Sequence, residues 1–357
     1  MRIVRAALSV IVVLFLVLAP RPLLSALRED PMAHLFEVKQ PEWHGVIELW
    51  HIADFRTYQG SVTKFLRERC DRFAAAHPGV HIEVKGLTTK MYLDRVARGA
   101  FPDAYSFPAG FLYREQLRRL ELTLPALTGN LRAAESEGSV FAAPYLMSGY
   151  FLLINEQRLL ESGGDPPAEA TRELLQAYLS DGELSVPPVL GAYFGLSGES
   201  RDYADFQKGR VTAAVADARA YGDLLRDTDG NLLLRALPLS GYTEQVMYLG
   251  AAANTDDRRA SLIAELCAYL LSDGVQQELT ALGAMPVRPR LDNIVYGMDT
   301  LDAWYASYAA DTVAPDAFAY QRHRDALLED ATRAMAGEAG GCEAFSERMA
   351  VVLAEGN

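Results

Sequence analysis

Positive charge is scarce in this sequence. Its 357 residues include 34 Lys and Arg against 47 Asp and Glu, which gives a formal net charge of −13. Proteins that bind nucleic acid need clustered Lys and Arg for the phosphates. The basic groupings here are scattered pairs, such as Arg118-Arg119 and Arg258-Arg259. The composition therefore argues against nucleic acid as a partner and against electrostatic docking on anionic lipid.

Cysteine is also rare, with only Cys70, Cys267 and Cys342 in the chain. An odd count permits at most one internal disulfide and leaves one thiol over. Cys70 and Cys267 fall on the apolar sides of predicted helices, so we expect buried free thiols. None of the three follows the hydrophobic run near the N-terminus, so the sequence offers no site there for lipid attachment.

Motifs of catalysis and metal binding are missing or incomplete. The six histidines include no His-Glu-x-x-His pair. Gly195–Gly198 lacks the second glycine of a Gly-x-Ser-x-Gly elbow. Asp227–Asn231 begins like a calcium loop, but its twelfth position is Pro238 instead of Glu. No Gly-rich phosphate loop is present. We therefore expect a binding protein and not an enzyme, with no catalytic residue, no metal and no cofactor.

The N-terminus carries a hydrophobic run. Arg2 and Arg5 precede Ala6–Ala19, which contains no charge. As a helix, this run would be about 21 Å long, shorter than the hydrocarbon core of about 30 Å. It is typical of a signal peptide. Leu24-Ser25-Ala26 marks cleavage poorly, so an uncleaved anchor in contact with the membrane stays open. In both cases the body lies outside the cytoplasm, in the periplasm or at the cell surface.

Strands and helices alternate through the rest of the chain. Apolar periodicity predicts strands at 46–52, 80–84, 103–107, 150–155, 211–217, 232–237 and 246–252, and helices at 61–76, 89–98, 111–120, 173–180 and 258–271, with a helical remainder from residue 301. This order is typical of α/β folds with a largely parallel sheet. The chain is too long for one small core and suits two lobes.

Four passages of the chain carry a recognisable pattern: GVIELWHIADF with FLRERCDRFAAAHPGVHIEV, AAPYLMSGYFLLINEQRLLESGGDPP, FQKGRVTAAVAD, and YLGAAANTDDRRASLIAELCAYLLSDGVQQELTALGAMPVRP. Together they resemble family 1 extracellular solute-binding proteins, the sugar-binding partners of ABC transporters. No single motif is specific, but their order and spacing extend over about 250 residues. The resemblance explains why a strand, a short helix and a Gly-Gly stop follow one another at 150–164. This is where the chain would enter a second lobe.

The resemblance implies an α/β fold of the two-lobe periplasmic-binding-protein kind (type II), with hinge crossovers and a helical C-terminal part. The implied division is a signal peptide or anchor at 1–26, a linker at 27–44, lobe 1 at 45–140 and again at 241–290, lobe 2 at 141–240, and a helical part at 291–357 that belongs mostly to lobe 2. The implied ligand is a small polar solute, a sugar or a polyol, captured between the lobes and delivered to the permease subunits of an ABC importer.

Candidate ligand-binding residues lie where strands end and crossovers pass, because open α/β sheets bind ligands at the carboxyl ends of their strands. They are Asp54, Phe55, Arg56, Tyr58, Phe107, Tyr145, Tyr150, Asp217, Arg219, Tyr221, Tyr242 and Trp304. The chain departs from the family in two respects that bear on the ligand. Only about 50 residues separate Asn155 from Phe206, and Trp occurs only at positions 43, 50 and 304. Both departures argue against a large oligosaccharide site.

Two alternatives stay open from the sequence. A membrane-tethered module of the same fold could serve as a sensor or scaffold without a transport role. A secreted glycan-active enzyme would need two facing acids in the cleft, and the sequence does not identify such a pair.

Overall fold

The computed structural model of the chain describes residues 43–55, 57–227, 233–289, 291 and 294–354. The predicted signal or anchor segment and Arg56 lie outside these residues. The strands are β1 (Gly45–Ile52), β2 (Val80–Leu87), β3 (Ala104–Pro108), β4 (Ala134–Ser136), β5 (Ser139–Met147), β6 (Tyr150–Asn155), β7 (Leu184–Ser185), β8 (Ala213–Asp217), β9 (Leu234–Leu239) and β10 (Val246–Ala251). The helices are α3 (Val62–Ala75), α4 (Thr89–Ala97), α5 (Glu156–Glu161), α6 (Arg172–Ser180), α7 (Pro188–Tyr193), α8 (Tyr203–Gln207), α9 (Ala218–Asp227), α10 (Asp257–Leu270), α11 (Asp273–Gln277), α12 (Asp299–Asp311), α13 (Ala317–Met335) and α14 (Gly341–Ala354).

The first lobe is built on a six-stranded sheet in the order β2-β1-β3-β10-β5-β4. β1 pairs in parallel with β2 and β3, whereas β10 runs antiparallel to β3 and β5. In β2, Val80, Ile82 and Val84 are buried, while His81 and Glu83 between them are exposed. This alternation predicts a half-buried strand, as the structure shows.

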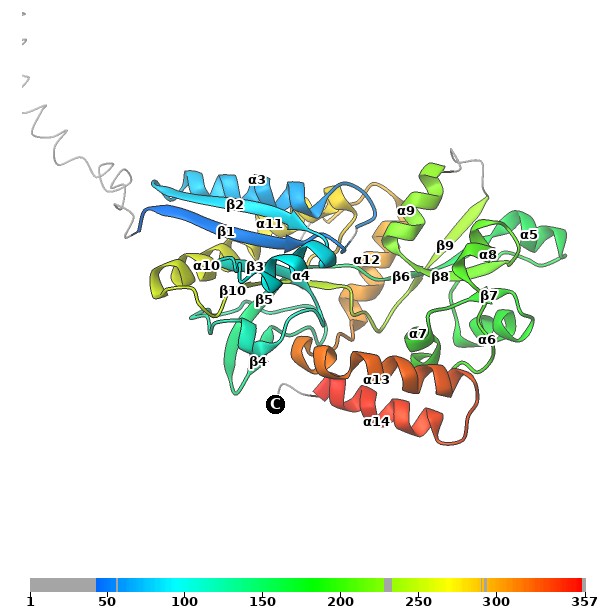
Figure 1. The fold of residues 1–357 in the computed structure, drawn as a ribbon. Coiled ribbons are helices and arrows are strands. Elements are labelled where there is room, and N and C mark those ends of the chain that lie inside the picture. Colours follow the sequence, from blue (N-terminus) through cyan, green and yellow to red (C-terminus); the bar gives the residue numbers. More distant parts are fainter. Residues whose placement is uncertain (1–42, 56, 228–232, 290, 292–293, 355–357) are drawn as a thin grey trace, which may run out of the picture.

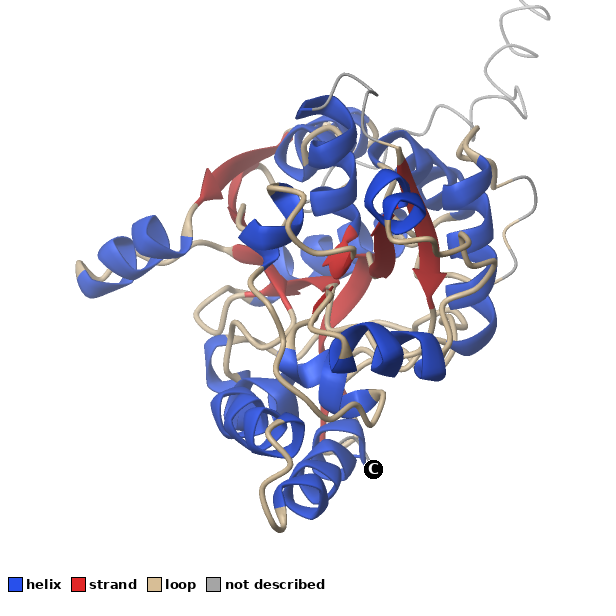
Figure 2. Ribbon diagram, turned by 90° about the vertical axis from the view of Figure 1, so that its right-hand side faces the viewer, coloured by secondary structure: helices blue, strands red, loops and turns tan. Residues whose placement is uncertain are grey.

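The second lobe is built on a separate four-stranded sheet in the order β7-β8-β6-β9. β7 and β8 are parallel, and β6 runs antiparallel to both β8 and β9. All six residues of β6 are buried, which agrees with its uninterrupted apolar sequence before Asn155. The two sheets lie in separate lobes, and helices lie around the strands of each (Figures 1 and 2).

Asn155 both ends β6 and starts the next helix. It has extended backbone angles, and its side-chain Oδ1 accepts a hydrogen bond from the backbone N–H of Arg158, 3.1 Å away. A side-chain acceptor at this position satisfies one of the free N–H groups of the first helical turn. α5 ends at Glu161, and Gly163, two residues later, has a φ of 79°, a left-handed conformation that favours glycine. The sequence therefore specifies strand, short helix and stop in this order.

The chain changes sheets at Ser148-Gly149, between β5 and β6. β5 belongs to the first sheet, so this crossover lies a few residues beyond the predicted boundary at residue 141. The return crossover follows β9 and leads to β10 in the first sheet. At the C-terminal end, α13 packs against α14 and against α7 of the second lobe (Figure 1). Near its start α13 also touches the first lobe, where Phe318 contacts the ring of Phe141.

One predicted helix is wrong. Between Phe111 and Leu120 the described structure has only a short 3₁₀ turn, Arg114–Gln116. Leu117 bridges to Ala252, and Leu120 bridges to Val140, both in antiparallel fashion. Backbone pairing with these distant segments keeps the region extended, although its apolar spacing is that of a helix face.

The cores of the two lobes are continuous on one face of the second sheet. Phe151 and Leu153 in β6 belong to the same cluster of buried residues as the first-lobe core, together with Trp304 in α12. Tyr150, Leu152 and Ile154 face the other way, into a second cluster with α6, α7 and α13. Cys70 and Cys267 are buried free thiols, as predicted, whereas Cys342 is exposed. Across the described part of the chain, no helix combines the length and apolar character that crossing a membrane requires.

Candidate functional site

An open cavity of about 560 Å³ lies at the carboxyl edge of the second sheet. The parallel strands β7 and β8 end there, and β6 begins there. All the residues that line the cavity belong to the second lobe. They are Tyr150, Ser185, Val186, Pro187, Pro188, Ser200, Arg201, Asp202, Tyr203, Val215, Ala216, Asp217 and Ala220. This is the edge at which open α/β sheets bind ligands.

Two neighbouring strand residues form one wall of the cavity. Tyr150, the first residue of β6, lies directly opposite Asp217, the last residue of β8. Opposite residues of an antiparallel pair have their Cβ atoms about 4.5–5.5 Å apart. Tyr150 is buried and Asp217 is half-buried. The pair therefore places an aromatic ring beside a carboxylate, a combination that suits a ligand with both apolar C–H faces and hydroxyl groups.

The carboxylate of Asp217 also begins α9. Its Oδ1 accepts a hydrogen bond from the backbone N–H of Ala220 at 2.8 Å. Burial raises the pKa of Asp217, and this hydrogen bond opposes the rise. Nearby, burial raises the pKa of Tyr203 to about 12, with a smaller contribution from the negative charge of Asp217. The hydroxyl of Tyr203 is shielded from solvent and has no hydrogen-bond partner within the described residues.

Hydrogen bonds to β7 and its flanking residues hold the segment that carries Ser200 and Arg201. Ser200 Oγ accepts from the backbone N–H of Val186 at 2.8 Å and donates to its carbonyl at 2.9 Å. The backbone N–H of Arg201 donates to the carbonyl of Leu184 at 3.0 Å, and Arg201 Nε donates to the carbonyl of Gly182 at 3.2 Å. These bonds fix the loop that carries Arg201, Asp202 and Tyr203 around the cavity.

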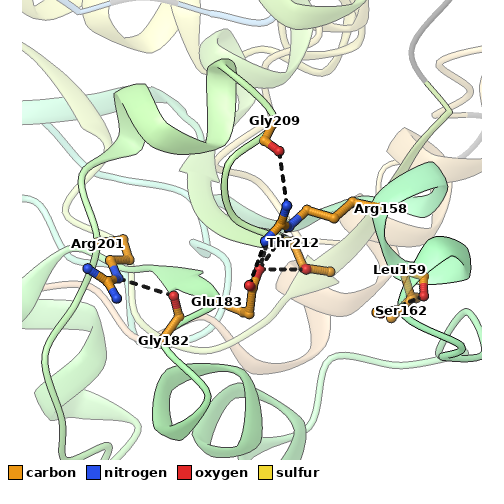
Figure 3. Close-up of polar contacts among 8 residues, drawn as sticks. All are labelled: Arg158, Leu159, Ser162, Gly182, Glu183, Arg201, Gly209 and Thr212. Atoms are coloured by element: carbon orange, nitrogen blue, oxygen red, sulfur yellow. Dashed lines mark hydrogen bonds and ion pairs between the residues drawn. The ribbon is translucent and has the colours of Figure 1, made fainter.

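The other ends of the same strands are joined by a charged network (Figure 3). Arg158 donates to both carboxylate oxygens of Glu183, from Nε at 3.0 Å and from Nη2 at 2.7 Å. Glu183 Oε2 also accepts from the backbone N–H and the hydroxyl of Thr212, at 2.8 and 2.7 Å. Hydrogen bonds from Arg158 hold the pKa of Glu183 below its ordinary value. The network ties α5 to the residues that precede β7 and β8.

A second half-buried acid, Glu244, lies next to Tyr150 in the return crossover. Glu244 Oε1 accepts a hydrogen bond from the hydroxyl of Tyr150, and Gln245 Nε2 donates to the same hydroxyl at 3.2 Å. Burial raises the pKa of Glu244, and the negative charge of Asp217 adds to the rise. Burial, followed by the charge of Glu244, raises the pKa of Tyr150 well above its ordinary value.

Of the predicted ligand-binding residues, the structure brings Tyr150 and Asp217 to this cavity. Arg219 and Tyr221 follow in α9. Arg219 Nε donates to Asp223 at 2.9 Å, and Tyr221 is buried against Phe151, with ring centroids 5.2 Å apart. Neither residue is among those that line the cavity.

The predicted residues after β1 make other contacts. Asp54 accepts a hydrogen bond from the backbone N–H of Thr89 at 2.8 Å, in the first turn of α4. Phe55 is buried in the first core cluster. Tyr58 packs against Tyr221 across the lobes, with ring centroids 5.6 Å apart. The backbone carbonyl of Tyr58 accepts a hydrogen bond from Arg226 Nη1 at 3.1 Å. In this structure the loop thus contacts α9 of the second lobe directly.

The remaining predicted residues lie in the interior. Phe107 stacks on Tyr248, and Trp304 stacks on Phe151 with ring centroids 4.9 Å apart. Tyr145 and Tyr242 are also buried in the core clusters. Each of these four side chains is at most 1% exposed. Their proposed contact with ligand stays a prediction.

Sequence reasoning missed several residues that line the cavity, chiefly Ser185 and the segment 200–203. Strand β7, which ends at Ser185, has only two residues and thus shows no periodicity. The one available signal was Pro187-Pro188 after this short strand, because proline is favoured at the start of a helix. The described residues contain no group of three or more His, Cys, Asp or Glu side chains that could hold a metal ion.

Comparison with known protein families and with curated protein sequences found no match. Comparison with solved structures found many. A cyclic α-maltosyl-1,6-maltose binding protein from Arthrobacter globiformis matches with a TM-score of 0.64 and 15% identity, over 87% of this chain and 99% of that one. An ABC substrate-binding protein from Listeria monocytogenes in complex with cycloalternan matches with a TM-score of 0.58 and 11% identity, over 86% and 97%. The sugar-binding protein MalE from Xanthomonas citri matches with a TM-score of 0.58 and 14% identity, over 86% and 96%.

These similarities confirm the predicted fold class. The chain has the two-lobe α/β fold of periplasmic binding proteins, and the match covers nearly the full length of each of the three solved chains. Because fold alone does not determine function, what this chain binds is argued below from the site.

Proposed function

We propose that this chain is an extracytoplasmic solute-binding protein that captures a small polar solute, a sugar or a polyol. The observation that carries the proposal is the cavity at the carboxyl edge of the second sheet, where the ring of Tyr150 lies beside the carboxylate of Asp217. The named structural neighbours bind sugars, which supports this ligand class. They are binding proteins, which supports binding without catalysis.

The cavity can supply the affinity that such a protein needs. A micromolar ligand requires about 8 kcal/mol. Hydrogen bonds contribute roughly 1 kcal/mol each, and Ser185, Arg201, Asp202 and Asp217 provide donors and acceptors. The ring of Tyr150 adds an apolar surface for C–H groups. A volume of about 560 Å³ suits a small solute.

In this proposal, the bound solute is delivered to the permease subunits of an ABC importer. The residues that line the cavity belong to the second lobe, so the solute favours closure where it also contacts the first lobe and thereby binds the closed form more tightly than the open form. The N-terminal hydrophobic run would direct the body out of the cytoplasm, as a cleaved signal or as a retained anchor.

A sensor or scaffold role without transport is the second candidate, and one observation favours it. The loop after β1 packs directly on α9 of the second lobe through Tyr58, Tyr221 and Arg226. Lobes that are held together by their own residues need no ligand to close. The experiment below therefore also separates the two candidates.

The test is thermal unfolding of the purified chain with glucose, maltose, maltotriose, sorbitol and single amino acids. A ligand at 100 times its Kd stabilises the folded state by about 2.7 kcal/mol. We expect a sugar or sorbitol to raise the melting temperature, and Asp217→Ala to abolish the rise. Glu169→Ala, an exposed carboxylate that does not line the cavity, is the matched control and should keep it. If no solute shifts the melting temperature, solute binding is contradicted and the sensor or scaffold role is favoured.

A further inference from the structure

The hydroxyl group of Tyr150 is fully engaged by the return crossover. It donates its proton to Glu244 Oε1 and accepts from Gln245 Nε2 at 3.2 Å. A tyrosine hydroxyl has one proton to donate. Tyr150 therefore has none left for a solute, and what it offers the cavity is a ring in a fixed orientation.

The backbone of Tyr150 is fixed as well. Its N–H donates to the hydroxyl of Tyr308 in α12 at 2.9 Å, and Tyr308 is fully buried. The preceding residue is Gly149, where a β-carbon would lie 2.4 Å from Cζ of Tyr308. Only glycine leaves room for this approach. Tyr150 is thus held at both ends, by Tyr308 at its backbone and by Glu244 at its hydroxyl.

The same residues join the crossovers between the lobes. Thr243 Oγ1 donates to the carbonyl of Ser148 at 2.8 Å, and the backbone N–H of Ser148 donates to the carbonyl of Gln245 at 2.8 Å. The backbone N–H of Thr243 donates to the carbonyl of Val313, which follows α12, at 2.9 Å. These bonds connect the two crossovers between the sheets with the segment that follows α12, and Tyr150 is the member of this group that lines the cavity.

Glu244 carries a free-energy cost of folding that a purely structural role does not explain. Its Oε2 is shielded from solvent and has no hydrogen-bond partner among the residues described. Burying a polar atom without a partner disfavours folding. Such an acid, hydrogen-bonded to a residue that lines the cavity, therefore points to a role in binding.

We propose that Glu244 is a positioning residue: it orients the ring of Tyr150 against the solute and thereby sets the affinity of the cavity. The inference rests on the proposed function, since it concerns the same site. It assigns a role to a crossover residue that does not line the cavity. Its consequence is that Glu244 and Tyr150 act on binding as one unit.

The test is isothermal titration calorimetry on the full chain with maltose, glucose and sorbitol. We expect Glu244→Ala to raise the Kd about tenfold and Tyr150→Phe, which keeps the ring, to raise it about fivefold. The double variant should bind no more weakly than Glu244→Ala alone, because residues in one hydrogen-bonded unit are not additive. Glu244→Gln keeps an acceptor for the Tyr150 hydroxyl and should restore binding to within about threefold. Glu169→Ala is the control for loss of an acid elsewhere.

The possible results distinguish failure of the proposed solute binding from failure of the positioning role of Glu244. If the unmodified chain binds none of the three solutes, the proposed function fails and the inference fails with it. If the unmodified chain binds but Glu244→Ala binds equally well, or if the losses in the double variant add, only the inference is overturned. Should Glu244→Ala not fold, Tyr150→Phe decides, and unchanged binding by that variant overturns the inference.

Discussion

The backbone carbonyl oxygen of Tyr58 lies where a side chain on Gly222 would have to be. A β-carbon built at Gly222 would be 2.2 Å from this oxygen and 3.1 Å from Cδ2 of the Tyr58 ring. Tyr58 belongs to the loop after β1 in the first lobe, and Gly222 lies in α9 of the second. The absence of a side chain at Gly222 therefore permits this contact between the lobes.

Gly222→Ala should break this contact between the Tyr58 loop and α9. The added methyl group must displace the Tyr58 loop, and overpacking of this kind typically costs about 1–3 kcal/mol. Urea unfolding of the variant should show a loss of that size. Gly274→Ala in α11 is the matched control, since a β-carbon there meets nothing within 4 Å. Alanine in a helix is favoured over glycine by roughly 0.5–1 kcal/mol, so the control should be neutral or more stable. Equal behaviour of the two variants would mean that the lobes do not depend on this contact.

His51 should make the protein sensitive to mild acid. Its Nδ1 lies 2.9 Å from Ser106 Oγ in the buried core, and burial lowers its pKa to about 4. In the unfolded chain the ordinary pKa is near 6.5, so between pH 6.5 and 4 the unfolded state binds a proton that the folded state does not. Stability should therefore fall by about 3 kcal/mol as the pH decreases through this range, since one pKa unit corresponds to about 1.4 kcal/mol.

Unfolding by urea at several pH values checks this prediction against His51→Asn. Asparagine cannot take up a proton, so the pH slope between 6.5 and 4 should be smaller in the variant, whatever its absolute stability. If wild type and variant show the same slope, His51 is not responsible for acid sensitivity.

Glu183 should stabilise the second lobe through the network of Figure 3. Glu183→Ala removes the acceptor of two Arg158 hydrogen bonds and of both Thr212 donors, while Arg158 Nη1 keeps the carbonyl of Gly209 at 3.4 Å. Loss of a partner to charged or buried donors costs about 2–3 kcal/mol, and chemical denaturation at pH 7 should show it. Because the pKa of Glu183 is lowered in the folded state, this contribution is present above its unfolded pKa and is lost as the pH falls.

Thr212→Val is the matched control for this network. It removes only the hydroxyl and keeps both the Arg158 pair and the backbone N–H bond to Glu183. Its loss should be about 1 kcal/mol. A loss in Thr212→Val as large as that in Glu183→Ala would show that the Arg158 pair contributes little.

Local patterns in the sequence predicted much of the fold. The alternation in β2 and the uninterrupted apolar run of β6 are properties of single segments, and so is the Asn155 cap. The helix expected at Phe111–Leu120 failed because its outcome depends on pairing with Val140 and Ala252, which no local pattern contains. The apolar spacing of a segment indicates that one of its faces is buried, but it does not indicate which distant segment covers that face.

The residues of the site were harder to predict from the sequence, because their roles also depend on contacts between distant segments. Asp217 could be placed because it ends a strand, where α/β sheets bind ligands, and Tyr150 could be placed because it flanks the first crossover. Trp304 was predicted to contact ligand, yet in this structure it stacks on Phe151, a contact between distant parts of the chain. Glu244 was missed because its significance depends on a hydrogen bond to Tyr150, which only the packed crossovers reveal.

Asp217→Asn should make the protein more stable at neutral pH. Burial raises the pKa of this carboxyl in the folded state, so above its ordinary value the folded chain holds a proton that the unfolded chain has released. Stability must then fall as the pH rises through that interval. Asparagine carries no charge to bury and can still accept from the N–H of Ala220, because Asn and Asp are comparable helix caps. The difference between variant and wild type in urea unfolding should favour the variant at pH 7 and shrink toward pH 4. A variant that is less stable than wild type at pH 7 would mean that Asp217 already has a compensating partner, and it would weaken the case for a solute as the group that completes this wall of the cavity.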